Sequence, residues 1–247
     1  MFAILGGSGL AKLSALGSPR RRVMRTPFGE PSGALTFGEL GGQEVVFLAR
    51  HGYGHTIAPH EINYRANIWA LKELQVSGVF AMATVGGIAS DLGPGTLALP
   101  DQIIDYTYGR KGTFFETAEA SVTHIDFTLP YTQGLRRQLL EAARVCGEPL
   151  IDGGVYACTQ GPRLETAAEI ERLARDGATM VGMTGMPEAA LAREAELDYA
   201  ALAVVVNHAA GRGDSRTAIR LDDIENVLQA CVVRAVRILE CAVGQAK

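Results

Sequence analysis

The hydrophobic and polar positions of the chain form two alternating kinds of segment. Short apolar runs rich in β-branched residues predict strands that are buried on both faces. These runs cover residues 2–5, 45–49, 79–83, 155–158, 180–182 and 200–206. Elsewhere, apolar residues recur every three or four positions, which predicts helices with one apolar stripe. The expected helices cover residues 63–74, 133–145, 167–175, 187–196 and 222–243.

The alternation of strands with helices predicts an α/β fold. Helices that connect successive strands are typical of a mainly parallel, mixed sheet that is flanked by helices on both faces. No internal repeat, low-complexity tract or Pro/Ser-rich linker divides the sequence, so we expect a single domain over residues 1–247. The last helix has a wide apolar stripe, and Asp222 is predicted to be its N-cap.

The balance of charged residues argues against one class of protein, the nucleic-acid-binding proteins. The chain has 23 Lys and Arg against 27 Asp and Glu, a net charge of −4. This balance argues against a protein whose main task is to neutralise nucleic-acid phosphates, so no nucleic-acid partner is expected. We interpret the single basic run, residues 20–22, as a solvated loop.

The location of the protein is predicted from what the sequence lacks. No apolar stretch reaches the roughly 20 residues that span a bilayer, so no membrane partner is expected. The N-terminus has neither the charged start nor the cleavage site of a signal peptide. The cysteines are scattered without a CxxC pair, which favours reduced core thiols in a cytoplasmic protein. They are Cys146, Cys158, Cys231 and Cys241.

Residues with candidate chemistry follow the predicted strands. In parallel α/β sheets, ligands bind outside the carboxyl ends of the strands. Small, hydrogen-bonding and cationic residues recur at these ends, which predicts an anion site built from several loops. The side chains that suit an oxyanion are Ser8, Arg50, His51, Thr84 and Thr184. Glu165 and Asn207 add one carboxylate and one amide to this predicted site. These residue types by themselves do not identify the ligand.

The glycine turn at residues 6–9 fits none of the common nucleotide or nucleophile motifs. Lys12 stands where a dinucleotide fingerprint has its third glycine, and Leu10 replaces the last glycine of a nucleophile elbow. No Walker loop occurs. The amides of the turn and the Ser8 hydroxyl suit an oxyanion, and a plain structural turn is the alternative.

Three histidines lie close together without forming a metal motif. Glycines and Pro59 separate His51, His55 and His60, so no helix presents the imidazoles on one face, and we expect no metal. Arg50 and His51 are better interpreted as an anion-binding pair, with Arg as a planar fork and His as an extra donor. A surface arginine beside a hydrogen-bonded histidine is the alternative.

Six blocks of sequence stand in an order that is typical of one enzyme family. They cover residues 6–10, 49–52, 63–71, 122–125, 160–163 and 182–188. Together they resemble the trimeric purine nucleoside phosphorylases, most closely the methylthioadenosine phosphorylase branch. The resemblance extends from residue 2 to about residue 207 and implies that inorganic phosphate, as co-substrate, cleaves a purine nucleoside without a cofactor.

The resemblance also implies a role for each matching residue. Phosphate would be bound by Ser8, Arg50, His51, Thr84, Thr184 and the backbone of Val85. Met183 would lie against the ribose and Leu164 against the purine face. Asn207 and His51 would be catalytic, with Asn207 at the N7/O6 edge of the base. His124 matches a residue that the family lends to the 5′ pocket of a neighbouring subunit, which implies a homotrimer.

The base-binding end and the 5′ end of the implied site together predict the substrate. Asn207 stands where adenine-selective members have an aspartate, and Glu165 matches a glutamate that accepts the N1–H of a 6-oxopurine. Apolar Leu221 and Ile224 suit a 5′-methylthio group, so methylthioinosine is the expected nucleoside. Other options are a methylthioadenosine or inosine/guanosine phosphorylase and, from a different class, a nucleotide-binding α/β oxidoreductase or a non-catalytic nucleoside-binding protein.

Overall fold

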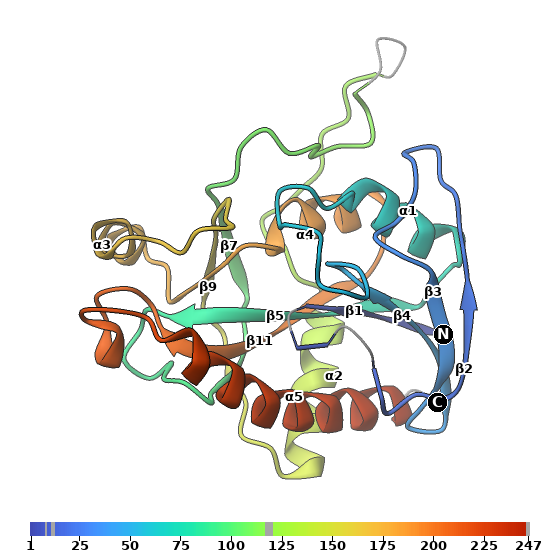
Figure 1. Cartoon of the computed structure of the whole chain (residues 1–247). Coiled ribbons are helices and arrows are strands. Elements are labelled where there is room, and N and C mark those ends of the chain that lie inside the picture. Colours follow the sequence, from blue (N-terminus) through green and yellow to red (C-terminus); the bar gives the residue numbers. More distant parts are fainter. Residues whose placement is uncertain (8, 11–12, 117–120, 246–247) are drawn as a thin grey trace.

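The computed structural model describes residues 1–7, 9–10, 13–116 and 121–245. Within them, every expected strand and helix is present (Figure 1). The expected strands are β1 (Phe2–Gly6), β4 (Gln43–Ala49), β5 (Gly78–Gly87), β9 (Val155–Cys158), β10 (Met180–Gly182) and β11 (Tyr199–His208). The helices are α1 (Tyr64–Glu73), α2 (Gln133–Cys146), α3 (Ala167–Arg175), α4 (Gly185–Glu194) and α5 (Leu221–Gly244). The boundaries differ from expectation by a few residues.

Several short elements were not expected from the pattern. They are β2 (Gly17–Arg22), β3 (Leu35–Leu40), β6 (Leu97–Leu99), β7 (Gln102–Asp105), β8 (Ile151–Asp152) and the 3-10 helix η1 (Gly213–Ser215). The interpretation of residues 20–22 as a loop is wrong, because they pair with β3 in the exposed edge strand β2. An edge strand that carries charge has no apolar run to reveal it, and the charge discourages pairing with other chains.

The central strand of the sheet is β5. Its first half pairs in parallel with β1, its last residues pair antiparallel with β10, and β11 runs parallel along its other edge. The remaining strands extend the sheet in the order β2-β3-β4-β1-β5-β10-β9-β7, with β6 and β8 beyond β11. Parallel pairings outnumber antiparallel ones in the described residues, so the mainly parallel, mixed sheet is confirmed.

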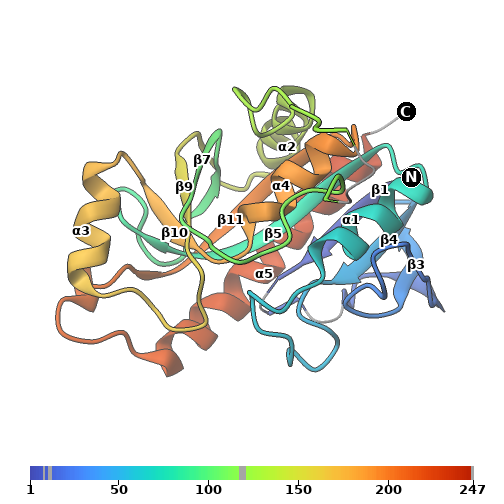
Figure 2. The ribbon, with the colours of Figure 1, turned by 90° about the horizontal axis from the view of Figure 1, so that it is seen from above.

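Helices cover both faces of this sheet. Helices α1 and α4 lie side by side on one face and α2 and α5 lie on the other, while α3 lies at one end (Figure 2). Ile68 of α1 and Leu191 of α4 belong to one hydrophobic core, and Leu139 of α2 and Ile238 of α5 belong to a second. Each fully buried side chain of this size contributes about 1.5–3 kcal/mol.

The start of α5 corrects one expectation. Arg220, not Asp222, is the N-cap residue, and Asp222 lies in the first turn of the helix with Asp223. Carboxylates in a first turn are favoured by the positive end of the helix dipole, which explains why the aspartates occur there without capping. No helix of the described chain has the length and apolar character needed to cross a membrane.

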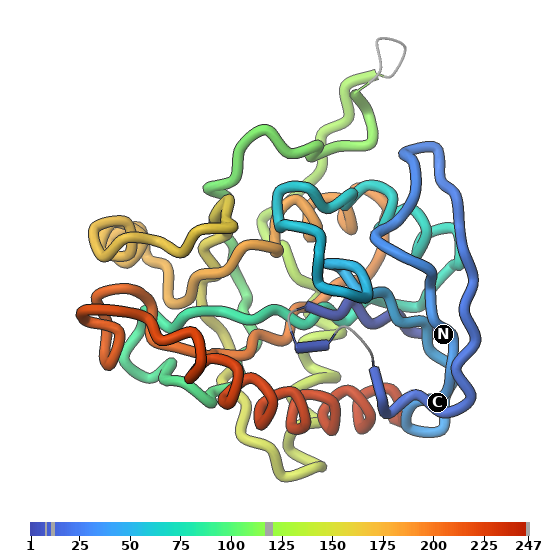
Figure 3. The backbone as a smooth tube through the Cα atoms, in the orientation of Figure 1, coloured from blue at the N-terminus to red at the C-terminus, as the bar shows by residue number. Residues whose placement is uncertain are grey.

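Residues 106–116 and 121–130 form a long connection that extends beyond the layered body (Figure 3), although Phe114 packs in the core. They connect β7 to α2 and carry several exposed apolar side chains, including Tyr108 and Val122. His124 lies on this excursion and is exposed. Two of the cysteines, Cys158 and Cys231, are buried, the other two are partly buried, and all are free thiols.

Candidate active site

A pocket of about 760 Å³ lies at the ends of β5, β10 and β11. It brings together most of the residues that the sequence predicted for the site. These are His51, Thr84, Val85, Leu164, Glu165, Met183, Thr184, Asn207, Leu221 and Ile224. The register between β5 and β11 shifts between Val205 and Asn207, and such a bulge changes the direction of the side chains that follow it. Both Val206 and Asn207 line the pocket.

Hydrogen bonds orient the polar groups at one end of the pocket. Glu165 accepts a hydrogen bond from the Thr159 hydroxyl at 2.6 Å. The amide nitrogen of Asn207 donates to the backbone carbonyl of His208 at 2.6 Å. An amide nitrogen carries two hydrogens, so Asn207 retains a second N–H and its carbonyl oxygen for a ligand. This end therefore offers a carboxylate acceptor beside an amide that can both donate and accept.

A second group of lining residues suits a small oxyanion. Thr84 within β5 and Thr184 just after β10 supply hydroxyl groups, and Gly7 supplies backbone. A Cβ at Gly7 would lie 2.8 Å from the Met82 carbonyl, so only glycine fits there without a shift. Ser8, which was expected to bind phosphate, lies outside the described residues.

His51 is neutral and has a defined tautomer. Its Nδ1 lies 2.8 Å from the Ile57 carbonyl, which only accepts, so Nδ1 carries the proton and Nε2 is left with a lone pair. Burial, with the hydrogen bond to Ile57 opposing it and the nearby charge of Arg50 adding to it, lowers the pKa of the imidazole to about 4. The expectation that His51 is an extra donor is therefore corrected: its remaining nitrogen is an acceptor.

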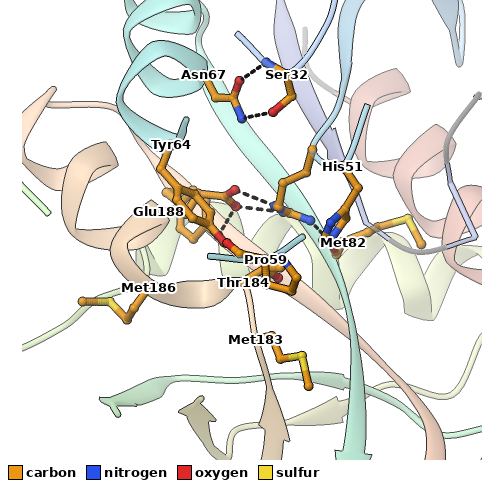
Figure 4. A network of polar contacts seen from close by, with 12 residues as sticks. Ser32, His51, Pro59, Tyr64, Asn67, Met82, Met183, Thr184, Met186 and Glu188 are labelled. Carbon is orange, nitrogen blue, oxygen red and sulfur yellow. Dashed lines mark hydrogen bonds and ion pairs between the residues drawn. The ribbon is translucent and has the colours of Figure 1, made fainter. Parts of the chain in front are cut away.

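Arg50 does not line the pocket but lies behind its wall. Its side chain is 1% exposed and forms two hydrogen bonds with the fully buried Glu188, at 2.6 and 2.8 Å. Nη1 donates to the Met82 carbonyl and lies 3.2 Å from where a Cβ of Gly7 would be. Burial opposes the charge of the guanidinium, but Glu188 raises the pKa of Arg50 above its ordinary value. Figure 4 shows Glu188 with the dashed lines of its contacts, and Thr184 and His51 nearby.

An apolar wall completes the pocket. It is formed by Ile219, Leu221, Ile224 and Leu228 on α5 and the segment before it. Leu221 is 68% exposed in the single chain, so this part of the pocket is open to solvent. His124 is not among the lining residues, since it lies on the exposed excursion.

The sequence did not predict two residues that orient side chains of the site, Glu188 beside Arg50 and Thr159 beside Glu165. Glu188 lies within the family-like block at residues 182–188, where a carboxylate in the apolar start of a helix was the available signal. Thr159 directly follows the buried strand β9, a position typical of site residues, but it lies one residue before the family-like block at residues 160–163. In the described residues, no three or more His, Cys, Asp or Glu side chains are grouped so that they could hold a metal ion.

Comparison with known proteins identifies the family. The sequence model described as the phosphorylase superfamily matches residues 1–243. The chain belongs to this superfamily. It is 52% identical to a probable S-methyl-5′-thioinosine phosphorylase of Pseudomonas syringae pv. tomato, covering 93% of this chain and 92% of that relative. It is 49% identical to a 6-oxopurine nucleoside phosphorylase of Pyrococcus furiosus, covering 85% and 80%.

Solved structures place the phosphorylase fold over nearly the whole chain. A methylthioadenosine phosphorylase from Schistosoma mansoni, in complex with adenine, matches with a TM-score of 0.92 and 33% identity. The match covers 98% of this chain and 90% of that one. A methylthioadenosine phosphorylase from an antarctic soil metagenomic library matches with a TM-score of 0.90 and 36% identity, covering 98% and 84%. The sequence resemblance to nucleoside phosphorylases is thereby confirmed.

Proposed function

We propose that this phosphorylase converts S-methyl-5′-thioinosine and inorganic phosphate into hypoxanthine and 5-methylthioribose 1-phosphate. One observation carries the proposal: a single pocket joins an oxyanion wall, a polar end that contains Glu165 and Asn207, and an apolar wall that contains Leu221 and Ile224. These three regions match the phosphate, the 6-oxopurine and the methylthio group of the substrates.

Phosphate is bound by Thr84, Thr184 and the backbone at Gly7 in this proposal. The described contacts of Arg50 use three of its five N–H groups, so two remain to reach an anion beside Gly7. Because Nε2 of His51 is an acceptor, it suits the hydroxyl of hydrogen phosphate. A protonated oxyanion therefore fits this site without a change in the charge of His51.

The reaction exchanges one bond for another. The ribosyl C1′–N9 bond breaks, its electron pair leaves with the purine, and a phosphate oxygen forms the new bond to C1′. The proton of hydrogen phosphate is transferred overall to the base. Bound phosphate stabilises the positive charge that develops on the sugar, and Asn207 stabilises the departing purine by accepting from N7–H. Neither a covalent enzyme intermediate nor a cofactor is needed.

Base choice follows from Glu165 and Asn207. The Glu165 carboxylate accepts the N1–H that hypoxanthine has and adenine lacks, and the free N–H of Asn207 donates to O6. Adenine would place its N1 lone pair against the carboxylate. A buried mismatch of this kind discriminates by up to about 10⁴-fold. The names of the relatives from Pseudomonas and Pyrococcus support a 6-oxopurine.

The choice of nucleoside depends on the apolar wall. Burying a methylthio group there contributes on the order of 1–2 kcal/mol. A 5′-hydroxyl group gains nothing from the same surface, so inosine is the poorer substrate. The Pyrococcus relative, named only for its 6-oxopurine, supports inosine or guanosine as the second candidate.

The proposal includes a cytoplasmic homotrimer. The apolar wall is open at Leu221 in the single chain, and the excursion that carries His124 exposes apolar side chains that suit burial against another copy. In a closed ring of three heterologous contacts, each copy would complete the 5′ end of its neighbour's site with His124.

The test follows the fate of phosphate. Methylthioinosine is incubated with the purified protein and phosphate in metal-free buffer, and the products are followed by ³¹P NMR and by the absorbance of hypoxanthine. We expect one sugar phosphate for each hypoxanthine and no turnover without phosphate. Base release at the same rate in phosphate-free buffer would show a hydrolase and reject the proposal.

A further inference from the structure

The guanidinium group of Arg110 is hydrogen-bonded to two segments that lead into the pocket lining. Its Nε donates to the side-chain oxygen of Gln160 at 3.1 Å, and its Nη2 donates to the carbonyls of Gln160 and Thr159 at 2.8 and 3.3 Å. Its Nη1 donates to the carbonyls of Met183 and Met186 at 2.9 and 2.6 Å. The first group begins the loop that carries Leu164 and Glu165, and the second flanks Thr184.

Tyr64 extends these contacts to a third segment. Its hydroxyl accepts from Nη1 of Arg110 at 3.2 Å and donates to the Pro59 carbonyl at 2.9 Å. Pro59 lines the pocket at the end of the segment that begins with His51. Figure 4 shows Tyr64 and Pro59 near Thr184 and Met183. One side chain is therefore linked to the segments that carry the base-binding, ribose-binding and oxyanion-binding residues.

The partners of Arg110 set it apart from an ordinary ion-pairing arginine. All six acceptors are neutral: four backbone carbonyls, one side-chain amide oxygen and one phenol. Arg110 is half-buried and is not among the residues that line the pocket. A rigid fork of five donors is suited to holding several carbonyls at fixed separations, whereas the three donors of a lysine share one nitrogen.

We propose that Arg110 is a positioning residue that sets the distance between the base-binding loop and the loop that carries Met183 and Thr184. Phosphorolysis requires C1′ to lie between the phosphate and the departing purine. These groups are held by different loops, so an error in loop spacing is an error along the reaction coordinate. A misplacement of about 1 Å costs about 100-fold in rate. This inference rests on the proposed function for its substrates.

The test compares Arg110 with a matched arginine elsewhere. Arg136 of α2 also donates to two backbone carbonyls, those of Leu99 and Pro100, and to a glutamine side chain. Unlike Arg110, it also forms an ion pair, with Asp152, and none of its partners lines the pocket. We compare Arg110→Gln, Arg110→Lys and Arg136→Gln with the wild type. The readouts are kcat and KM for methylthioinosine and methylthioadenosine, the thermal midpoint, and amide hydrogen exchange.

Arg110→Gln is expected to lower kcat for methylthioinosine by about 100-fold, with a smaller rise in KM. The ratio of kcat/KM for methylthioinosine to that for methylthioadenosine should also fall, because Glu165 is no longer held in place. Arg110→Lys should recover part of kcat. Arg136→Gln should lower the thermal midpoint at unchanged kinetic ratios.

Hydrogen exchange separates this inference from the proposed function. Without any substrate, Arg110→Gln should speed the exchange of amides in residues 159–165 and 183–186 together, and Arg136→Gln should not. Equal effects of the two arginines on the kinetic ratio and on exchange would overturn the positioning role. If the wild type does not use phosphate while the exchange result holds, the proposed function fails and the link between the loops remains.

Discussion

Glu188 binds the guanidinium of Arg50 through both of its carboxylate oxygens, and both side chains are buried. Tyr199 donates a further hydrogen bond to Glu188 at 2.8 Å. The pair holds Nη1 of Arg50 behind Gly7, at the oxyanion wall of the pocket. The geometry of the proposed phosphate site therefore depends on a carboxylate that does not line it.

Glu188→Gln should weaken both the fold and the phosphate site. Removing one charge of a buried pair costs about 3–5 kcal/mol, because the other charge is left uncompensated. We expect a loss of this size in the free energy of unfolding, measured by urea denaturation, and a higher KM for phosphate. Glu148→Gln is the matched control, because Glu148 binds Arg234 and Arg237 outside the pocket. An unchanged phosphate KM in Glu188→Gln would contradict this role.

Thr159→Val should impair recognition of the base. The substitution keeps the shape of the side chain and removes the hydroxyl that donates to Glu165. A hydrogen bond to a charged group contributes about 1.5–3 kcal/mol, so kcat/KM for methylthioinosine should fall by about 10- to 100-fold. Thr159→Ser keeps the donor and should restore most of the loss. Equal activity of the Val and Ser variants would show that the Thr159 hydroxyl has no part in base recognition.

The buried His51 should make the protein less stable in acid. Its folded-state pKa of about 4 lies below the ordinary value of 6.5, so the unfolded chain binds the proton first as the pH falls. Stability is therefore full above pH 6.5 and is lost progressively toward pH 4, by on the order of 3 kcal/mol. Urea denaturation between pH 7 and pH 4 should show a steeper loss for the wild type than for His51→Gln. Parallel curves for the wild type and His51→Gln would mean that His51 is not held neutral by burial.

The shared-site trimer predicts complementation between inactive variants. Thr184→Val damages a site within its own chain, and His124→Ala damages the site of a neighbour. After exchange of subunits at equal amounts, about one quarter of the sites should have both residues, because each mixed ring contains one intact site. Activity that stays at the level of the unmixed variants would reject the shared site, as would a fully active monomer.

Apolar runs and helical periodicity are local patterns, and they made most strands and the helices predictable. Contacts between residues far apart in the sequence leave no such local pattern. The apolar runs of β5 and β11 identify strands buried on both faces, whereas the exposed strand β2 has no such run. Polar residues at strand ends predicted His51, Thr84, Thr184 and Asn207 of the pocket lining. The partner of Arg50 lies 138 residues away, so its bond to Glu188 was not predictable from spacing. The tautomer of His51 likewise depends on the backbone of Ile57.

Asn207→Asp should change the preferred base. A carboxylate at this position repels O6 of hypoxanthine and accepts from the 6-amino group of adenine. We expect the relative transition-state energies of methylthioinosine and methylthioadenosine to shift by about 2–4 kcal/mol toward adenine. Asn207→Ala should lower the use of both nucleosides without favouring adenine. An unchanged ratio in Asn207→Asp would remove Asn207 from base recognition.

The most direct test is the ratio of kcat/KM values of the wild-type protein for methylthioinosine, methylthioadenosine and inosine, measured side by side at saturating phosphate. Glu165 and Asn207 predict that methylthioinosine exceeds methylthioadenosine by at least about 100-fold. The apolar wall predicts that it also exceeds inosine by about 10-fold. A kcat/KM for methylthioadenosine that equals or exceeds the value for methylthioinosine would contradict the proposed function.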